Sequence, residues 1–359
     1  MEPHGERSPL PSVRTAVVGA SGYSGQELLR YLARHPVFRL SLVTSRQNAG
    51  QPLSEFVHGL PRDLASLTFV DAAPDFALAE QADLFFLAVP HGAAAPYAVA
   101  LREAGKTVVD LSADFRTTDP SVYREFYDHD HPAPALLAEA VYGLPEIHRE
   151  RLRSARLIAA PGCFPTSIIL PLAPFLRPPS PILPRSIVAT SLSGVSGAGR
   201  KLETRLLFGE IADNMYAYGV PKHRHLGEIE QELSLAAGEK ITMTFVPHLV
   251  PMHRGMLSTI SADFDRALAS YPMTDMDVFN VLQDAYGQEP FVEVLPPGKM
   301  PEARAVANSN RIQVAARVDG RTNRLLLFSS LDNLGKGNAS QAIQAANLAL
   351  GLDETSGVA

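Results

Sequence analysis

The 359-residue sequence predicts an α/β protein with a doubly wound parallel sheet in its first half and an α+β region with a mostly antiparallel sheet after it. Three observations support this fold class. The length suits two domains of ordinary size. Short apolar runs alternate with helical patterns up to about residue 160, as in a parallel sheet. After that point, long apolar stretches follow one another with turn signals between them, as in antiparallel strands.

Composition and charge exclude several classes of protein. Hydrophobic residues make up 46% of the chain and charged residues 19%, a normal globular balance. A net charge of −6 gives no electrostatic case for a nucleic-acid or anionic-membrane partner. No apolar stretch is long enough to span a membrane. The single cysteine cannot form an internal disulfide, and the N-terminus lacks the apolar core of a secretory signal, so we expect a cytoplasmic protein. Residues 1–12 are expected to form a disordered tail.

A glycine-rich turn follows the first predicted strand, 16–18. It reads Gly-Ala-Ser-Gly-Tyr-Ser-Gly over residues 19–25, and helical spacing of leucines then continues as far as His35 and Pro36. Glycines between a strand and a helix let backbone N–H groups approach a pyrophosphate, as in a Rossmann-type dinucleotide site. The spacing departs from the common G-x-G-x-x-G, so a purely structural turn is the alternative.

The end of the second predicted strand indicates which dinucleotide binds. Thr44, Ser45 and Arg46 occupy the place where NAD-binding domains usually carry an acidic residue for the ribose 2′-hydroxyl. A hydroxyl and a guanidinium suit a 2′-phosphate, so we predict NADP(H) rather than NAD. The alternative is an ordinary solvated loop arginine.

Two further strands are predicted at 84–89 and 107–111. The first ends at Pro90 and His91, where the carboxyl edge of a parallel sheet places ligand loops. We expect both residues near the cofactor, although a packed or capping role for His91 is equally consistent with the pattern.

The second half contains the only cysteine, Cys163, in the stretch APGCFPTS. We predict a helix that begins at Thr166, which puts the thiol just before the first turn, where the helix dipole lowers its pKa. Beside a dinucleotide domain, such a thiolate suggests redox chemistry at the aldehyde level through a thioacyl intermediate. The competing interpretation is a buried core cysteine.

A nucleophilic thiol also needs a base, and the densest histidine cluster is KHRHLGEIEQ. His225 is our first choice and His223 the second, with Glu228 three residues after His225 on a predicted helix, where its carboxylate can orient the imidazole. Exposed histidines are the alternative. The sequence specifies no metal site, since one distant thiol and H-x-H do not define one.

Eight stretches spread in order along the chain, among them VVGASGYSGQELLR, APGCFPTS, TSLSGVSGAGRK, YGVPKHRHLGEIEQ and DNLGKGNASQAIQAAN, resemble the N-acetyl-gamma-glutamyl-phosphate reductase family. The cysteine box and the H-R-H segment are specific to a small group of enzymes, whereas the glycine loop and the D-N-L segment are shared with aspartate-semialdehyde dehydrogenases. One departure is Leu226-Gly227 where the family commonly has x-Pro before Glu228.

The resemblance implies an acyl-phosphate reductase with Cys163 as nucleophile and a catalytic histidine in H-R-H. It implies that NADPH reduces N-acetyl-L-glutamyl 5-phosphate to the 5-semialdehyde, in arginine biosynthesis. It also implies that residues 328–359 rejoin 13–162 as the NADP-binding domain, leaving 163–327 for catalysis and oligomerisation, and it favours a homodimer or homotetramer. Cationic donors for the acyl phosphate are expected among Arg116, Arg200 and Arg254. Residues expected to contact the cofactor are Gly19, Ser21, Gly22, Tyr23, Ser24, Gly25, Ser45, Arg46, Pro90, His91, Ser193, Gly194, Gly197 and Asn333.

Two other functions stay open at this level. A related enzyme with a different acyl phosphate would carry the same residues. A catalytically silent NADP-binding sensor would instead bury Cys163 in its core.

Overall fold

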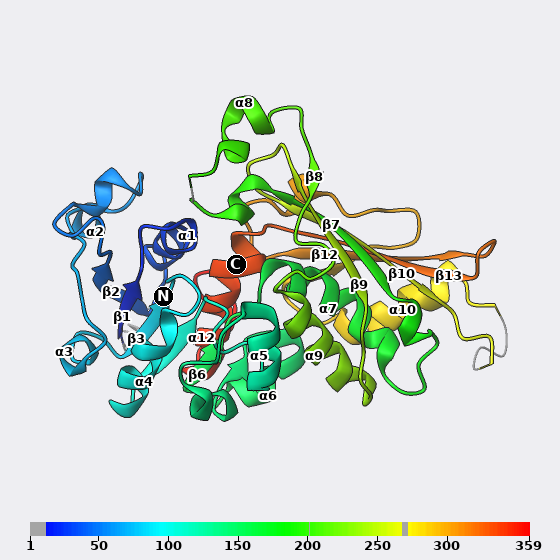
Figure 1. Ribbon diagram of the computed structural model, residues 1–359, viewed down its shortest axis with the longest axis horizontal. Helices are drawn as coiled ribbons and strands as arrows, with labels where there is room; N and C mark the ends of the chain where they lie inside the picture. The colour runs from blue at the N-terminus through cyan, green and yellow to red at the C-terminus, as the bar shows by residue number, and fades with distance from the viewer. Residues whose placement is uncertain (1–11, 201, 268–271) are drawn as a thin grey trace, which may run out of the picture.

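The computed structural model describes residues 12–200, 202–267 and 272–359; most of the expected N-terminal tail lies outside these ranges. Two sheets dominate the described chain (Figure 1). A six-stranded sheet lies at one end, long strands of a seven-stranded sheet extend to the other, and helices α7 (Cys163–Leu176) and α12 (Ser340–Ala349) lie between them. The predicted fold class is therefore confirmed.

The first sheet has the order β2-β1-β3-β4-β6-β5, and all its neighbouring strands are parallel. Chain order reverses between β1 and β3, and in open parallel sheets ligands bind beside such a switch point, at the carboxyl ends of the strands. The strands are β1 (Val13–Val18), β2 (Phe38–Thr44), β3 (Leu84–Leu87), β4 (Thr107–Asp110), β5 (Val141–Tyr142) and β6 (Leu157–Ala159).

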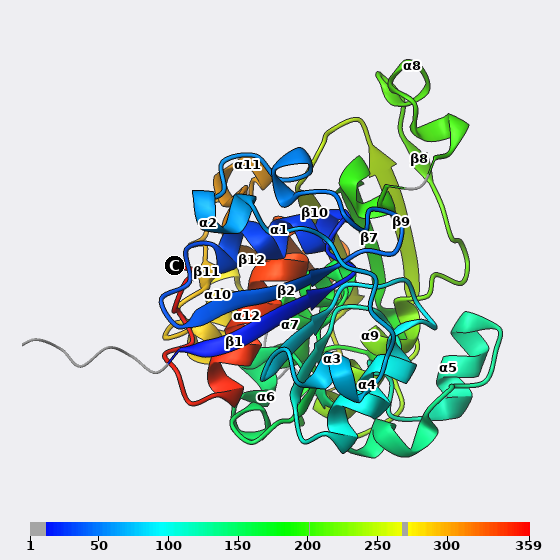
Figure 2. The same ribbon diagram turned by 90° about the vertical axis from the view of Figure 1, so that its left-hand side faces the viewer.

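Helices cover both faces of this sheet (Figure 2). On one face α1 (Tyr23–Leu32), α6 (Pro145–Leu152) and the C-terminal α12 share a buried cluster with the strands. On the other face α4 (Ala94–Glu103) and the short α3 (Phe76–Ala79) form a second cluster. Buried strands covered on both sides explain the continuous apolar runs in the sequence. The chain that leaves the second sheet thus returns to pack on the first.

The second sheet has the order β11-β12-β13-β10-β7-β9-β8. The β11–β12 and β7–β9 pairs are parallel and the others are antiparallel, so the sheet is mixed with antiparallel pairs in the majority. A hairpin turn joins β12 to β13, with Asp319 and Arg324 as the register pair beside the turn. The strands are β7 (Val188–Gly194), β8 (Tyr216–Ala217), β9 (Thr244–Val250), β10 (Met256–Asp263), β11 (Val292–Val294), β12 (Ile312–Asp319) and β13 (Arg324–Leu331).

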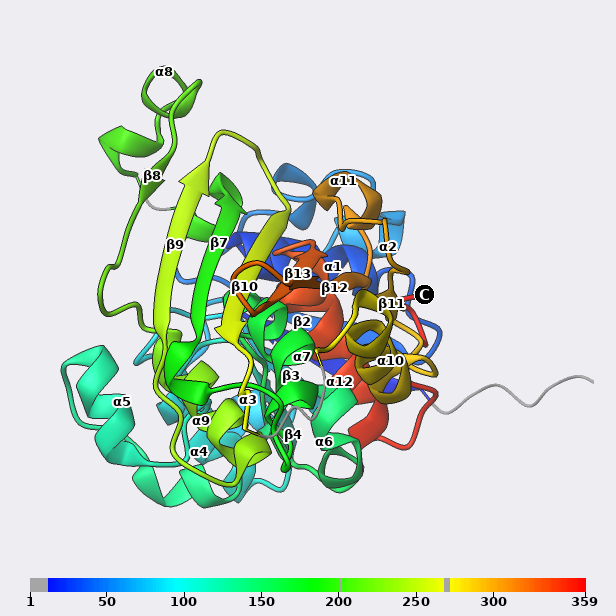
Figure 3. The ribbon, with the colours of Figure 1, turned by 90° about the vertical axis from the view of Figure 1, so that its right-hand side faces the viewer.

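The three longest helices of the second half of the chain pack on one face of this sheet. There α7, α9 (Leu226–Ala237) and α10 (Asp275–Tyr286) pack in one large apolar cluster. Along β7, β9 and β10 the residues of the opposite face alternate with buried ones and stay half-buried or exposed. The segment with η5 (Thr204–Leu206) and α8 (Phe208–Ile211) projects from the body in all three views (Figure 3).

The remaining elements are short, except α5. They are α2 (Arg62–Ala65), α5 (Pro120–Tyr127), α11 (Ala303–Val306), the 3-10 turns η1 (Leu53–Glu55), η2 (Pro134–Ala138), η3 (Pro184–Ser186) and η4 (Val195–Ala198), and the π-helical turn η6 (Gly335–Ala339). No helix in the described ranges is long and apolar enough to cross a membrane.

Two boundaries differ from those expected. Helix α7 begins at Cys163 itself, with Gly162 as its N-cap, and not at Thr166. Pro165 falls in the first turn, where a helix needs no N–H from the chain, so the proline does not delay the start. Strand β13 continues to Leu331, so the chain leaves the second sheet four residues after the expected boundary at 327.

Candidate active site

A cavity of about 640 Å³ opens at the carboxyl ends of β1, β2 and β3. The turn between β1 and α1 forms one wall, including Gly19, Gly22 and Ser24. Gly25 lies behind this wall, where a Cβ would come within 2.5 Å of the Cα of Ala20. Glycine there allows α1 to pack tightly against the turn, and Gly22 leaves open space for a ligand, since a Cβ there would meet nothing within 4 Å.

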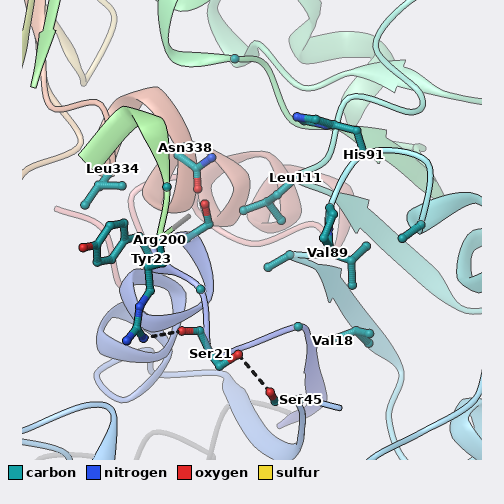
Figure 4. A pocket seen from close by; sticks show the side chains of 18 of the residues that line it. Val18, Ser21, Tyr23, Ser45, Val89, His91, Leu111, Arg200, Leu334 and Asn338 are labelled. Atoms are coloured by element: carbon teal, nitrogen blue, oxygen red, sulfur yellow. Dashed lines mark hydrogen bonds between the residues drawn. The ribbon is translucent and has the colours of Figure 1, made fainter. Parts of the chain in front are cut away.

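Hydroxyls and guanidinium groups meet at the end of β2 (Figure 4). The hydroxyl of Ser21 lies 3.0 Å from that of Ser45, and Nη1 of Arg200 donates to the backbone oxygen of Ser21 at 2.9 Å. Arg200 also lies over the ring of Tyr23. Arg46 is exposed and forms a loose ion pair with Asp71, at 3.7 Å. These contacts put Arg200 at the turn between β1 and α1, on the wall of the cavity that also reaches Cys163, and its expected contact with the acyl phosphate stays a prediction.

Cys163 lies where the large cavity meets a smaller one of about 330 Å³. Its side chain is half-buried at the first residue of α7. Gly337, in the π-helical turn η6, packs against it: a Cβ on Gly337 would approach the Cβ of Cys163 to 2.7 Å. The cysteine is therefore held between the start of α7 and the segment that leads back to the first sheet.

Burial sets the protonation state of this thiol. It raises the pKa of Cys163 to about 11, although the first-turn N–H of Phe164 and the charges of Arg116 and Arg224 act in the opposite direction. Burial therefore outweighs the lowering of the Cys163 pKa that we expected from the helix dipole. A thiol that is withdrawn from water loses more solvation of its anion than one helix terminus returns. The resting group is the neutral thiol.

The two histidines of H-R-H lie against the cysteine segment. His225 lines both cavities, and a Cβ on Gly162 would approach Nε2 of His225 to 2.7 Å, so the ring packs directly on the residue before the thiol. Burial, His223 and nearby arginines hold the pKa of His225 well below its usual range. Burial and then Arg224 lower the pKa of His223 to about 4. Nδ1 of His223 accepts the backbone N–H of His225, so its proton is on Nε2.

The buried carboxylate of Glu228 bonds to residues of three other segments. Its Oε1 pairs with Nη1 of Arg116 at 3.0 Å, and its Oε2 accepts from the hydroxyl of Tyr142 at 2.8 Å and from the N–H of Gly162 at 3.1 Å. The separation from Nε2 of His225 is 3.9 Å, too long for a hydrogen bond. Glu228 therefore holds the backbone beside the thiol and does not orient His225 directly.

Arg116 reaches the wall of the large cavity, but three of its five N–H groups are used by Glu228, Ala160 and Leu111. Arg254 lines neither cavity; its guanidinium bridges Glu27 and Asp332. Its expected contact with substrate is therefore replaced by a link between α1 and the segment before η6. Arg116 and Arg254 are paired within the protein for the same reason: a buried guanidinium requires carboxylate or carbonyl partners.

His91 lies at the opposite side of the large cavity, after β3 (Figure 4). Its Nδ1 accepts the N–H of Ala113, which leaves the proton on Nε2. Burial, followed by the charges of Arg224 and Arg116, lowers its pKa to about 3. His91 is thus a neutral group whose free nitrogen can only donate.

Most of the expected cofactor contacts line the large cavity: Gly19, Ser21, Gly22, Tyr23, Ser24, Ser45, Arg46, Pro90, His91, Gly197 and Asn333. Gly25 and Gly194 do not line it, and Ser193 lines the smaller cavity. Asn333 uses its side chain within the protein, accepting from Gly255 and donating to Ser196. It therefore shapes the wall more than it offers free donors.

Several cavity residues were missed by the sequence reasoning, and three of them carry polar groups that matter below. Arg224 lines both cavities and Lys222 lines the smaller one, on either side of His223. Their positions in the sequence, directly beside the candidate histidines, were a usable signal. Asn338 lines the large cavity with a buried Oδ1 that has no partner in the described structure. Asn338 reaches the cavity wall because it lies in the π-helical turn η6, and no sequence pattern predicts such a turn.

Comparison with protein families matches both halves of the chain. Residues 14–155 match the semialdehyde dehydrogenase NAD binding domain, and residues 163–333 match the semialdehyde dehydrogenase dimerisation domain. A protein of Akkermansia muciniphila named N-acetyl-gamma-glutamyl-phosphate reductase is 48% identical over 350 residues, which cover 97% of this chain and 99% of that protein. One of the same name from Pelobacter propionicus is 46% identical over 347 residues, or 96% and 98% of the two chains.

Solved structures with the same fold include aspartate semialdehyde dehydrogenases. The Vibrio cholerae enzyme II, complexed with ASA, has a TM-score of 0.68 at 19% identity, and the match covers 94% of this chain and 98% of that one. The Candida albicans enzyme with NADP has a TM-score of 0.68 at 18% identity, covering 94% and 99%. At these identities the likeness extends to the fold alone.

Proposed function

Because the chain belongs to the N-acetyl-gamma-glutamyl-phosphate reductase family, an oxidoreductase family acting on acyl phosphates, we propose that it reduces N-acetyl-L-glutamyl 5-phosphate to N-acetyl-L-glutamate 5-semialdehyde and phosphate. We propose NADPH as the reductant and arginine biosynthesis, in the cytoplasm, as the pathway. One observation supports the chemistry above all others: the only cysteine lies where a cavity with a glycine-rich dinucleotide turn meets a second, cationic cavity.

In the proposed reaction the sulfur of Cys163 attacks the acyl carbonyl. A C–S bond forms, the carbonyl–phosphate bond breaks, and phosphate leaves with the electron pair. His225 is neutral at rest and lies beside the cysteine segment, so it accepts the thiol proton during the attack. After reduction, the same imidazolium returns the proton as the tetrahedral adduct collapses and frees the thiol. Backbone N–H groups at the start of α7 are suited to hold the developing oxyanion.

The large cavity fits a phosphorylated dinucleotide. Gly22 leaves room for a pyrophosphate at the start of α1, and Ser21, Ser45 and Arg200 offer donors beside the end of β2. Arg46 completes a positively charged rim, which favours a 2′-phosphate. Asn338 offers an unpaired side-chain oxygen on the wall of the cavity that Cys163 also lines, suited to a nicotinamide carboxamide. When bound, the nicotinamide supplies the hydride for the thioester.

We also propose a homo-oligomer, a homodimer or homotetramer, formed through the second sheet. Residues 163–333 match a dimerisation domain, and the sheet face away from α7, α9 and α10 has no long helix over β7, β9 and β10 in the described chain. The helix-free face carries half-buried apolar side chains on adjacent strands, which include Leu192, Val246, Leu257 and Phe328.

The direct test is phosphate-dependent reduction of NADP⁺ with N-acetyl-glutamate semialdehyde. Wild type is compared with Cys163→Ser, with NAD⁺ in place of NADP⁺, and with phosphate omitted. We expect activity in the wild type only, dependent on phosphate and stronger with NADP⁺. Equal activity in both proteins would remove Cys163 from the mechanism. Absence of activity in the wild type would refute the proposed substrate.

A further inference from the structure

The smaller cavity has the charge expected of an anion site. Lys222 and Arg224 line it together with Cys163, Ser193, His223 and His225. No carboxylate is found among its lining residues in the described chain. Both histidines nearby are neutral, so the two cations account for the positive charge of this cavity.

The two cations also lack protein partners within the described ranges. Neither Arg224 nor Lys222 forms an ion pair or a hydrogen bond there; Nζ of Lys222 lies 5.3 Å from the ring centre of Phe126. The three arginines expected from the sequence behave differently. Arg116 is paired with Glu228, Arg254 with Glu27 and Asp332, and Arg200 with the backbone of Ser21. The free positive charge beside the thiol therefore comes from the segment that carries the histidines.

The positions of the two cations differ relative to the reacting sulfur. Arg224 lines both cavities, which meet at Cys163, whereas Lys222 lines the smaller one only. The charge of Arg224 acts on the pKa of Cys163, of both neighbouring histidines and of His91. Arg224 therefore lies at the junction where the bond to sulfur forms, and Lys222 lies farther along the smaller cavity.

We propose that Arg224 binds the phosphate group of the acyl phosphate and that Lys222 binds the substrate's α-carboxylate. The assignment rests on the proposed function and specifies its anion sites. Phosphate is attached to the carbonyl that Cys163 attacks, so its cation must lie at the junction of the cavities. The carboxylate is at the other end of a three-carbon spacer, within the smaller cavity. As the carbonyl–phosphate bond breaks, the leaving oxygen gains negative charge, which the guanidinium of Arg224 stabilises.

The reverse reaction separates the two roles, because phosphate and semialdehyde are then independent substrates. We expect Arg224→Gln to raise the KM for inorganic phosphate about 10- to 100-fold, the loss typical of one hydrogen bond between charged groups, with little change in the KM for semialdehyde. Lys222→Met is expected to do the opposite. Arg224→Lys, which keeps the charge, should recover part of the phosphate affinity. Arg62→Gln, an exposed arginine outside both cavities, is the matched control.

A second measurement needs no turnover. Bound phosphate should shield Cys163 from iodoacetamide, and Arg224→Gln should raise the phosphate concentration that gives half protection, while Lys222→Met leaves it unchanged. Unchanged protection and unchanged KM values in Arg224→Gln would overturn the assignment, as would an exchange of the two patterns. If the wild type catalyses no phosphate-dependent reaction but Arg224 still governs protection, the proposed function fails and the anion site stands. Circular dichroism checks that each variant is folded.

Discussion

Two opposing effects act on the pKa of Cys163, the helix dipole and burial. A helix N-terminus stabilises a thiolate by a fraction of its charge, whereas withdrawal from water destabilises it more strongly. Burial prevails here and raises the pKa of Cys163 to about 11. The free enzyme therefore holds a thiol and a neutral imidazole rather than a thiolate–imidazolium pair. In the proposed mechanism, proton transfer to His225 therefore accompanies the attack on the substrate.

This protonation state predicts how Cys163 reacts with iodoacetamide. Since only the thiolate reacts, the rate should rise about tenfold per pH unit between pH 7 and pH 9 and keep rising beyond. Every alkylation event reports Cys163, because it is the only cysteine. Stopped reactions analysed by mass spectrometry give the rate at each pH. A plateau below pH 8 would contradict a raised pKa and favour the lowered pKa of Cys163 that the sequence analysis expected.

Glu228 predicts a stability effect at the same scale. Glu228→Gln keeps the shape of the side chain but leaves the buried guanidinium of Arg116 without its counter-charge. We expect a loss of about 3–5 kcal/mol in the free energy of unfolding, measured with urea, because an uncompensated buried charge is costly.

The double variant Arg116→Met with Glu228→Gln is the control for this prediction. It removes both charges and should recover much of the loss. A cost below about 1 kcal/mol for Glu228→Gln alone would show that the pair is effectively solvated.

At the scale of elements, α7 needs an explanation because it contains Pro171 and Pro174. A proline inside a helix donates no N–H, so Pro171 leaves the carbonyl of Ser167, four residues earlier, without its helical partner. The hydroxyl of Ser329, on β13, donates to that carbonyl at 2.5 Å. The sheet thus satisfies the group that the helix cannot, and the helix that begins with the thiol stays continuous.

Ser329→Ala tests this compensation. The substitution leaves the buried Ser167 carbonyl unpaired, and we expect it to reduce the free energy of unfolding by about 1–3 kcal/mol. Ser261→Ala is a suitable comparison, since Ser261 lies on the neighbouring strand β10 but is half-buried and should matter little. Equal effects of the two substitutions, measured by thermal and urea unfolding, would argue against a specific role for Ser329.

At the scale of the whole molecule, the proposed oligomer makes a prediction about the helix-free face of the second sheet. Phe328 and Thr259 are register partners across β13 and β10 on this face. Phe328→Arg places a charge there, and in the proposed oligomer it would be buried without a partner, so we expect dissociation to a folded monomer.

Analytical ultracentrifugation of wild type and Phe328→Arg measures this effect. Arg62→Gln, remote from the sheet, serves as the control. An unchanged molecular mass would exclude this face as the interface.

Much of the fold followed from the sequence because its signals are local. Apolar runs identified the first four strands of the first sheet in chain order, and the glycines of 19–25 identified its ligand edge. Cys163 and the H-R-H segment stood out by residue type. These features depend on neighbours along the chain, so periodicity and composition reveal them.

Electrostatic partners and protonation states were decided only by the tertiary structure. The sequence offered Arg116, Arg200 and Arg254 as equivalent cations, yet folding pairs Arg116 with Glu228, 112 positions away, and Arg254 with Glu27, 227 positions away. It leaves Arg224 and Lys222 free beside the thiol. The direction of the shift in the pKa of Cys163 reversed for the same reason, because desolvation depends on everything that surrounds a group. The sequence by itself therefore indicated most of the elements and the proposed nucleophile, and the packing of distant segments determined which charged side chains remain unpaired beside it.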